Sequence, residues 1–262
     1  MTNSNNQKPV VLVIAGHDPS GGAGIQADIE SIANAGCHAA SVITSLTTQN
    51  TNQVVDVLPQ DPGPFRNQIS LILEDMDISA CKIGMIGCIK LLEVIVNELA
   101  ELKVPVVLDP VMSATTGKKF SDDEICKNLL TSLLPLTTLI TPNVIEATLL
   151  TQEDDINTAA NTLLNYGAES VLITGTHAET KEVVNSLYTK HNSLVEYHWE
   201  RLPDTFHGSG CTLSSRIAAL LALGNDLKTA VEKAQEYTWL SLKHGLNLGR
   251  GQAQPDRFYQ PK

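Results

Sequence analysis

Short apolar runs that end abruptly at glycine or at a carboxylate most strongly constrain the fold of this chain. Residues 9–15 read PVVLVIA and stop at Gly16, and the run over residues 105–112 carries Asp109. Continuous apolar runs of this length are typical of strands buried on both faces of a parallel sheet. Helical patterns separate them, so we predict an α/β fold with a mostly parallel central sheet and helices on both faces.

The same signals divide the rest of the chain. We predict further strands at residues 40–46, 53–58 and 170–174, a strand within residues 80–87 whose carboxyl end is freed by glycines, and a strand ending in a turn within residues 139–146. A late hairpin of strands 183–189 and 193–198 follows. Helices are predicted at 25–33, 64–74, 91–102, 159–166, from the glycine-rich residues 206–212 to Gly224, and at 226–246. The segment from Leu248 onward is rich in Gly, Pro and Gln and is predicted to be irregular. Because no linker interrupts the pattern, we expect a flexible tail of residues 1–8 and a single domain of residues 9–262.

Composition argues against several classes of protein. The formal net charge of −11 disfavours a nucleic-acid partner, which requires a basic face. No apolar run approaches the ~20 residues of a membrane-spanning helix, and the polar first residues lack the features of a signal peptide. The cysteines form an odd set without a CxxC pair: Cys37, Cys81, Cys88, Cys126 and Cys211. This set argues against a disulfide framework or a zinc site, so we expect a cytoplasmic protein without a membrane partner.

A glycine-rich motif, FHGSGCT at residues 206–212, opens directly into an apolar helical run. Gly208 and Gly210 allow the backbone N–H groups of the first helical turn to converge on one point, where the helix dipole favours an anion. The same positive field is expected to lower the thiol pKa of Cys211 and favour the thiolate. Such a cradle beside a base or nucleophile suits phosphoryl transfer. The alternative is a glycine-rich helix cap with a structural cysteine.

Two further polar stretches follow predicted strands. The turn of residues 16–24, GHDPSGGAG, is dense in glycine, but its spacing does not match the dinucleotide-binding fingerprint. Turns of this kind bind ligands at the strand ends of open α/β sheets, and a simple connection is the alternative. Residues 47–52 carry amides and hydroxyls that can hydrogen-bond a ring substrate or form a hydrophilic hairpin loop.

Charged side chains follow the later strands. Asp109, at the end of a strand, is a candidate for metal or phosphate chemistry, although Asp-Pro also ends many strands. Asn143 and Glu146 fall on one helical face, where they can hold a hydrated Mg²⁺, form an N-terminal capping box, or do both. The polar loop of residues 113–120 brings Lys118 and Lys119 as a possible flap over phosphates.

Taken together, these stretches resemble the hydroxymethylpyrimidine/phosphomethylpyrimidine kinases of thiamine biosynthesis, members of the ribokinase-like superfamily. The resemblance covers residues 10–246 and rests on six ordered motifs: GHDPSGGAGIQAD (16–28), QNT (49–51), KIGM (82–85), LDPVM (108–112), TPNVIE (141–146) and GSGC (208–211). It implies a three-layer α/β/α domain with a small strand lid. Relatives with Asp in place of Cys211 are sugar and nucleoside kinases, so in having a cysteine here the chain resembles the branch of pyrimidine and pyridoxal kinases.

The resemblance also implies roles for individual residues. Those that would contact the aminopyrimidine are Asp28, Gln49, Met85 and Val111. The backbone N–H groups of Gly208, Ser209 and Gly210 would stabilise the transferring phosphoryl group, while Cys211 would accept the substrate hydroxyl proton or orient that hydroxyl. Asp109 and Glu146 would bind Mg²⁺. Those expected near ATP are Asn143, Thr174, Gly175, Lys118 and Lys119.

The implied activity is the ATP- and Mg²⁺-dependent phosphorylation of 4-amino-5-hydroxymethyl-2-methylpyrimidine and then of its monophosphate, by a homodimer. A pyridoxal or pyridoxine kinase is one alternative, because that ring also carries a hydroxymethyl group. A catalytically weak protein that binds pyrimidine or pyridoxal phosphate is another. The chain departs from the family at two positions, since Thr174 stands where relatives carry a lysine near the nucleotide phosphates and His17 replaces a small hydroxyl residue. Lys118 or Lys119 would compensate for the missing cation.

Overall fold

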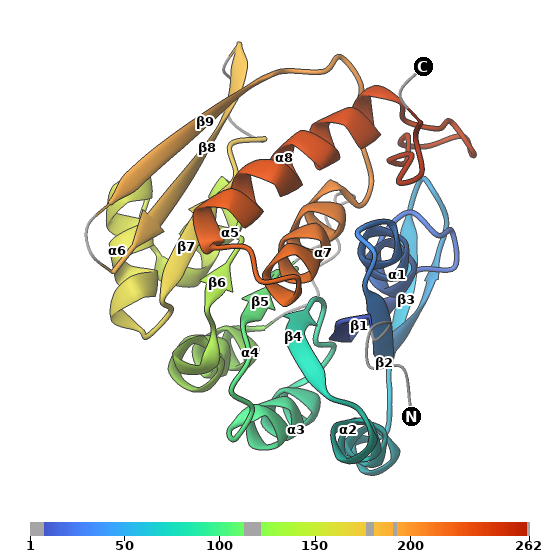
Figure 1. Cartoon of the computed structure of the whole chain (residues 1–262), viewed down its shortest axis with the longest axis vertical. Helices are drawn as coiled ribbons and strands as arrows, with labels where there is room; N and C mark the ends of the chain where they lie inside the picture. The colour runs from blue at the N-terminus through green and yellow to red at the C-terminus, as the bar shows by residue number, and fades with distance from the viewer. Residues whose placement is uncertain (1–7, 113–121, 177–180, 191–192, 261–262) are drawn as a thin grey trace, which may run out of the picture.

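Nine strands of the described residues join in one sheet (Figure 1). The computed structural model describes residues 8–112, 122–176, 181–190 and 193–260. In chain order the strands are β1 Val10–His17, β2 His38–Gln49, β3 Val54–Pro59, β4 Ile78–Ile83, β5 Val106–Leu108, β6 Leu139–Ile140, β7 Ser170–Ile173, β8 Glu182–Thr189 and β9 Leu194–Glu200. Across the sheet they lie in the order β3-β2-β1-β4-β5-β6-β7-β8-β9. All pairs between β2 and β7 are parallel, whereas β3, β8 and β9 pair antiparallel with their neighbours, which confirms the predicted late hairpin.

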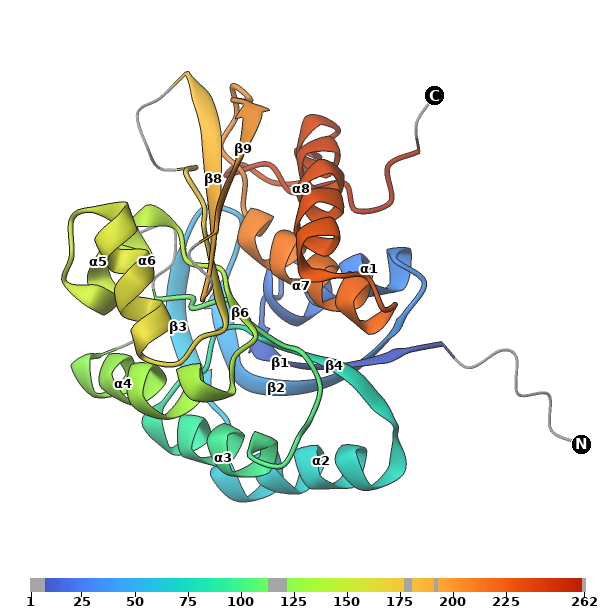
Figure 2. The same cartoon turned by 60° about the vertical axis from the view of Figure 1, so that its left-hand side comes forward.

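Helices cover both faces of this sheet, as the sequence predicts. They are α1 Gly24–Asn34, α2 Pro62–Asp75, α3 Ile89–Leu99, α4 Asp123–Asn128, η1 Leu129–Leu133, η2 Leu134–Leu136, α5 Val144–Thr151, α6 Ile156–Asn165, α7 Ser209–Ala222 and α8 Leu227–Lys243. Figures 1 and 2 show α1, α7 and α8 on one face and α2 to α6 on the other. The helical segment from α4 to η2 is absent from the sequence prediction. Asp122 begins it by accepting a hydrogen bond from the Ile125 N–H at 2.9 Å, an N-cap that the prediction overlooks.

Strand β1 illustrates why both faces are covered. Its side chains alternate between two apolar clusters: Val13 belongs to the cluster that includes Ile217 of α7, and Ile14 to the cluster that includes Phe65 of α2. All four side chains are buried, and each buried side chain of this size stabilises the fold by about 1.5–3 kcal/mol. The continuous apolar pattern of β1 therefore requires helices on both sides.

The bounds of β2 differ from the sequence prediction, and the C-terminal tail makes contacts that the prediction does not include. Strand β2 extends to Gln49, so that part of the predicted polar loop is strand. The segment after Leu248 forms no helix or strand over its described residues, as predicted, but it packs closely against the domain. An isolated bridge joins Phe206 to Ala253, and Arg257 is only 2% exposed. The irregular tail is thus part of the packed structure.

The strand order locates the ligand-binding edge of the sheet. Strand β1 lies between β2 on one side and β4 on the other, so the direction of strand addition reverses there. Open α/β sheets bind ligands outside the carboxyl ends of the strands at such a reversal. Asp18 follows β1, Gly84 follows β4 and Asp109 follows β5. The fold therefore brings three of the sequence motifs to one edge.

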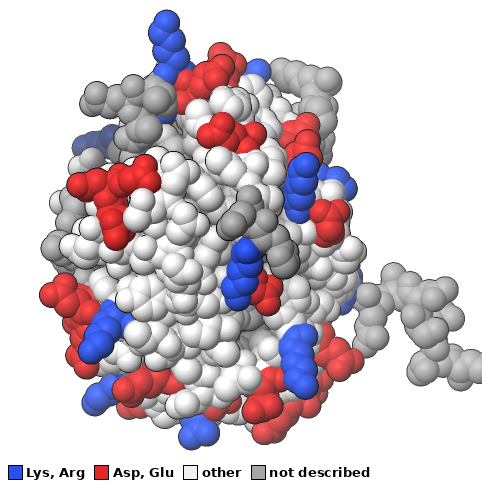
Figure 3. Space-filling view, turned by 90° about the vertical axis from the view of Figure 1, so that its left-hand side faces the viewer, with Lys and Arg blue, Asp and Glu red and all other residues white. Residues whose placement is uncertain are grey.

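Acidic and basic side chains are interspersed on the face of the molecule shown in Figure 3. Lys and Arg do not gather into a continuous basic patch on that face, in keeping with the net charge of −11. Across the part of the chain that the structure describes, no helix combines the length and the apolar character needed to cross a membrane.

Candidate active site

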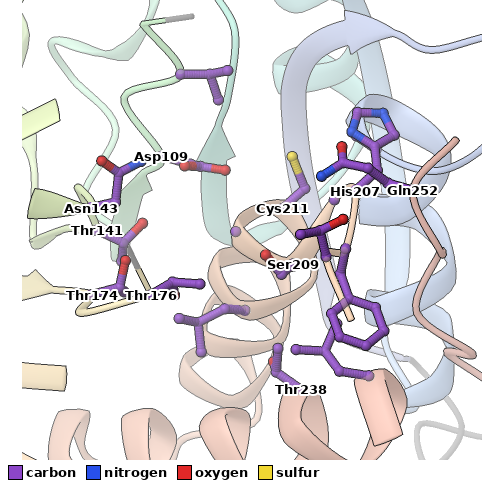
Figure 4. Close-up of a pocket in the computed structure, with 18 of the residues that line it drawn as sticks. Asp109, Thr141, Asn143, Thr174, Thr176, His207, Ser209, Cys211, Thr238 and Gln252 are labelled. Carbon is purple, nitrogen blue, oxygen red and sulfur yellow. The ribbon is translucent and has the colours of Figure 1, made fainter. Parts of the chain in front are cut away.

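A cavity of about 710 Å³ opens at the carboxyl ends of the central strands. This volume lies within the range of about 300–1,000 Å³ typical of small-molecule sites. Figure 4 shows Asp109, Asn143 and Thr174 on one wall, and His207 with Cys211 at the start of α7 on the other. The cavity therefore joins a side rich in oxygen ligands to a side built from glycine-rich loops.

Two of these glycine-rich loops are in direct contact. Gly208 has a φ of +85°, and a Cβ at this position would overlap the carbonyl oxygen of Gly22. A Cβ on Gly22 would in turn lie 2.5 Å from Cδ2 of His207. Only glycine at both positions allows the loop of residues 18–24 to pack against residues 206–211. The first and last sequence motifs thus form one site.

The buried carboxylate of Asp18 holds these loops together. Its Oδ2 accepts a hydrogen bond from the Ala23 N–H at 2.9 Å and lies 2.8 Å from Nε2 of His207, while Oδ1 accepts from the Ser20 N–H at 2.8 Å. Burial raises the pKa of Asp18, but the hydrogen bonds from His207 and Ser20 outweigh it and hold that pKa at about 2. Asp18 therefore remains charged at neutral pH and fixes His207 beside the cavity.

Helix α7 presents its N-terminus to the cavity. Gly208, its N-cap residue, offers no side-chain acceptor, and the N–H groups of a first helical turn have no partner within the helix. A Cβ on Gly210 would lie 3.7 and 3.8 Å from the two carboxylate oxygens of Asp109. An anion bound by the helix N-terminus would thus lie next to this carboxylate. A cation between the bound anion and the carboxylate of Asp109 would offset the repulsion between these two negative groups.

A buried ion pair lies beneath the helix start. Lys82 and Asp28 both have fully buried side chains, and Nζ of Lys82 lies 2.8 Å from Oδ1 of Asp28. The Ser215 hydroxyl of α7 donates to the same oxygen at 2.6 Å. Burial lowers the pKa of Lys82, but the charge of Asp28 outweighs this effect and raises the pKa above its ordinary value. Lys82 is therefore a permanently charged ammonium that also lines the cavity.

Two carboxyl groups of the cavity have raised pKa values. Burial and then repulsion by Asp109 raise the pKa of Glu146 to about 8. Burial also raises the pKa of Asp109, with Lys82 acting in the opposite direction and Asp28 adding to the increase. A divalent cation would favour the charged form of both carboxyl groups, so this pair suits a hard metal ion.

Cys211 departs from the sequence prediction. Burial raises the pKa of its thiol to about 12, and the Lys82 ammonium, which acts in the opposite direction, does not offset this. The carboxylates of Asp109 and Asp28 raise the pKa further. The predicted thiolate at neutral pH is therefore wrong, because desolvation and two nearby anions outweigh the positive helix N-terminus.

Comparison with known proteins assigns this site to a family. The sequence model of the family described as phosphomethylpyrimidine kinase matches residues 18–256, which include both glycine-rich loops. The chain belongs to the phosphomethylpyrimidine kinase family. It is 36% identical to the hydroxymethylpyrimidine/phosphomethylpyrimidine kinase of Synechococcus elongatus, covering 96% of this chain and 98% of that one. Its identity to the enzyme of the same name from Haemophilus influenzae is also 36%, over 92% of this chain and 93% of that one.

Solved structures of related kinases share the fold. A phosphomethylpyrimidine kinase from Clostridium difficile superimposes with a TM-score of 0.77 at 35% identity, covering 88% of this chain and 98% of that one. A pyridoxal kinase from Bacillus subtilis in complex with ADP gives 0.87 at 29% identity over 96% of this chain and 98% of that one. A Staphylococcus aureus pyridoxal kinase with AMP-PCP and pyridoxal also gives 0.87, at 25% identity over 96% of this chain and 94% of that one. The predicted ribokinase-like three-layer fold is confirmed.

The residues expected to contact the substrate divide into two groups in this member of the family. Gln49, Met85 and Val111 line the cavity. Asp28 does not, because its carboxylate is fully buried against Lys82 and Ser215. The expectation that Asp28 contacts the pyrimidine ring is therefore corrected. Asp28 is placed instead to hold the Lys82 ammonium in position.

Two of the residues expected near the nucleotide lie on the opposite wall (Figure 4). Asn143 and Thr174 line the cavity. The side chain of Asn143 accepts from the Glu146 N–H, and Glu146 accepts from the Asn143 N–H, both at 2.9 Å, which confirms the capping box. Gly175 is buried behind the cavity wall, where its N–H donates to Oδ1 of Asn185 at 3.0 Å. Lys118 and Lys119 lie outside the described residues.

Several side chains of the cavity have no role in the sequence prediction. Lys82 interrupts an apolar strand, and a buried lysine requires an anionic partner, so this signal is readable from the sequence. Asp18 and His207 belong to motifs in which only the glycines draw attention. Gln252 enters the cavity from the tail, and no local pattern indicates that the tail returns there.

Proposed function

We propose that the protein transfers the γ-phosphoryl group of ATP to the hydroxymethyl group of 4-amino-5-hydroxymethyl-2-methylpyrimidine and then to the resulting monophosphate. The observation that carries this proposal is the N-terminus of α7, open to a cavity that also contains Asp109 and Lys82. Phosphoryl transfer requires chiefly positioning and electrostatic stabilisation, which such a site supplies. The names of the relatives support the pyrimidine as substrate.

In this mechanism the substrate hydroxyl oxygen attacks the γ-phosphorus as the bond to the ADP oxygen breaks. The backbone N–H groups of Gly208, Ser209 and Gly210 stabilise the charge on the transferring group. Cys211 takes the hydroxyl proton in its thiolate form, which with a pKa of about 12 is the minor form at neutral pH. The Lys82 ammonium stabilises that thiolate, since its charge lowers the thiol pKa. Gln49, Met85 and Val111 hold the ring.

The residues present fit Mg²⁺. Asp109 and Glu146 would hold the ion or its waters, and Mg²⁺ binds through one or two carboxylates together with substrate phosphates. Among the described residues no cluster of three or more His, Cys, Asp or Glu side chains would hold a metal ion alone, in keeping with an ion that arrives with the nucleotide. When bound, Mg²⁺ would supply charge neutralisation between the phosphates.

On the nucleotide side, Asn143 and Thr174 would flank the ATP phosphates, with Gly175 behind them in the cavity wall. Thr174 lines the cavity, which suits a position where the resemblance implies a phosphate-binding lysine. Lys118 and Lys119 remain the candidates that would supply the missing positive charge.

A second substrate class is pyridoxal or pyridoxine. The pyridoxal kinases named above support it, because their TM-scores of 0.87 exceed the 0.77 of the phosphomethylpyrimidine kinase structure. A third possibility is a binding protein with little turnover, which the absence of a lysine at Thr174 would favour.

We further propose a cytoplasmic homodimer that includes the edge of the sheet. Val55 and Leu58 of edge strand β3 are 58% and 53% exposed, and Leu46 of β2 is 43% exposed. Such neighbouring apolar side chains often mark an interface. No disulfide joins the five cysteines, all of which lie within the described residues, and this suits a reducing compartment. Light scattering of the purified protein would test the dimer, and a monomeric mass would contradict it.

An assay of ADP release with the pyrimidine, its monophosphate and pyridoxal tests the proposed activity. We expect Mg²⁺-dependent ADP formation that is most efficient, in kcat/KM, with the two pyrimidines. A higher kcat/KM for pyridoxal would overturn the assignment of the substrate. Saturable binding of the pyrimidine without ADP release would overturn the assignment of kinase activity.

A further inference from the structure

The C-terminal tail reaches the substrate side of the cavity. It inserts between the turn that joins β2 to β3 and the residues just before α7. The Gln252 N–H donates to the Thr51 oxygen at 3.1 Å, and the His207 N–H donates to the Ala253 oxygen at 2.9 Å. Thr51 lies two residues after Gln49, and His207 immediately precedes Gly208. The tail therefore spans the gap between a candidate substrate-binding residue and the anion site.

This position of the tail is held tightly. Arg257 is 2% exposed, and its guanidinium donates to Oγ1 of Thr212 at 3.0 Å, to Oε2 of Glu30 at 3.0 Å and to the Gly22 oxygen. A Cβ on Gly251 would overlap the Thr51 oxygen, so the tail approaches the turn as closely as the backbone permits. Gln252 lies between Gly251 and Arg257, so these contacts fix its position.

Gln252 is that residue, and it differs from its neighbour Gln254. Gln254 is 5% exposed and donates its amide to the Ser20 oxygen at 3.2 Å, which is a structural role. Gln252 lines the cavity, and its side-chain amide forms no hydrogen bond with another described residue. Figure 4 shows it beside His207, on the same wall as Cys211. A carboxamide held there with its donor and acceptor unused suits a polar ligand.

We propose that Gln252 is a specificity-determining residue that binds the amino-substituted edge of the pyrimidine ring. A carboxamide presents a donor and an acceptor side by side, and an aminopyrimidine presents the complementary acceptor and donor in its ring nitrogen and amino group. The same bidentate match allows glutamine to select adenine. Pyridoxal lacks the amino group, so Gln252 favours the pyrimidine over pyridoxal. This inference rests on the proposed function of the same cavity.

Steady-state kinetics of Gln252→Leu and Gln252→Ala, with the full chain, test this role. A bidentate contact of this kind discriminates by roughly 5- to 150-fold, so we expect the KM for the aminopyrimidine to rise by that factor. The KM for ATP and kcat should change less than about twofold, and the KM for pyridoxal should change less than that for the pyrimidine. Gln53→Leu, an exposed glutamine of the β2–β3 turn, is the matched control.

A purely structural role for Gln252 would instead lower the melting temperature and affect all substrates equally, and that result would overturn the proposal. An unchanged pyrimidine KM in both folded variants would overturn it as well. Failure of the proposed function is distinguishable, because the wild-type protein would then release no ADP with the pyrimidine. In that case titration of the wild type and Gln252→Leu with the pyrimidine by calorimetry still decides whether Gln252 contacts the ring: weaker binding by the variant supports the contact, and equal binding refutes it.

Discussion

Replacing Lys82 by methionine tests two contributions of the buried ion pair, one to the stability of the fold and one to the electrostatics of Cys211. Among the described residues, the substitution leaves the fully buried carboxylate of Asp28 with only the Ser215 hydroxyl as a hydrogen-bond partner. Removing one member of a buried pair costs about 3–5 kcal/mol, a large part of the 5–15 kcal/mol by which a typical domain is stable. For a chain of this size we expect the melting temperature to fall by roughly 6–20 °C.

The double variant Lys82→Met/Asp28→Asn removes the uncompensated charge and should recover most of this stability. Its kcat should remain low, because Lys82 stabilises the Cys211 thiolate more strongly than Asp28 destabilises it. Thermal unfolding and ADP release measure the two effects. Lys90→Met, an exposed lysine of α3, is the control and should change stability by no more than about 0.5 kcal/mol. A folded double variant with wild-type kcat would refute the electrostatic role of Lys82.

Three further substitutions test the site. Cys211→Ala should fold but lose about 10²–10⁴-fold in kcat, unlike the control Cys88→Ala, and unchanged turnover would exclude a base role. The kcat of the wild type should rise with pH, because the thiolate fraction grows as the pH approaches the thiol pKa of about 12. Gly210→Ala should remain folded, because the added methyl meets Asp109 only at 3.7 Å, yet should lower kcat about 10²-fold by crowding the anion site; full activity would place the phosphoryl group elsewhere. Thr174→Lys should tighten ATP binding by roughly 10-fold, and a folded variant with unchanged affinity would contradict the missing-cation interpretation.

Much of the fold and part of the site can be predicted from the sequence, because they depend on local pattern. The apolar run of β1 requires burial on both faces wherever the strand lies. The glycine spacing at 208–210 predicts an open helix N-terminus, and the spacing of Asn143 and Glu146 predicts the capping box that the structure contains. These features involve residues a few positions apart, so backbone geometry alone constrains them.

Long-range contacts determine the protonation of Cys211, the burial of Asp28 and the path of the tail, which local sequence patterns do not predict. The helix N-terminus at Cys211 predicts a lowered pKa, but the tertiary structure encloses the thiol near two carboxylates and raises it. Asp28 belongs to a substrate-binding motif by resemblance, yet the pairing of its side chain with Lys82, 54 residues away, buries it. The tail follows no periodic pattern, and tertiary contacts such as those of Arg257 with Gly22 and Thr212 return it to the cavity. Electrostatic environment and burial depend on the sum of all neighbours in space, which no short stretch of sequence contains.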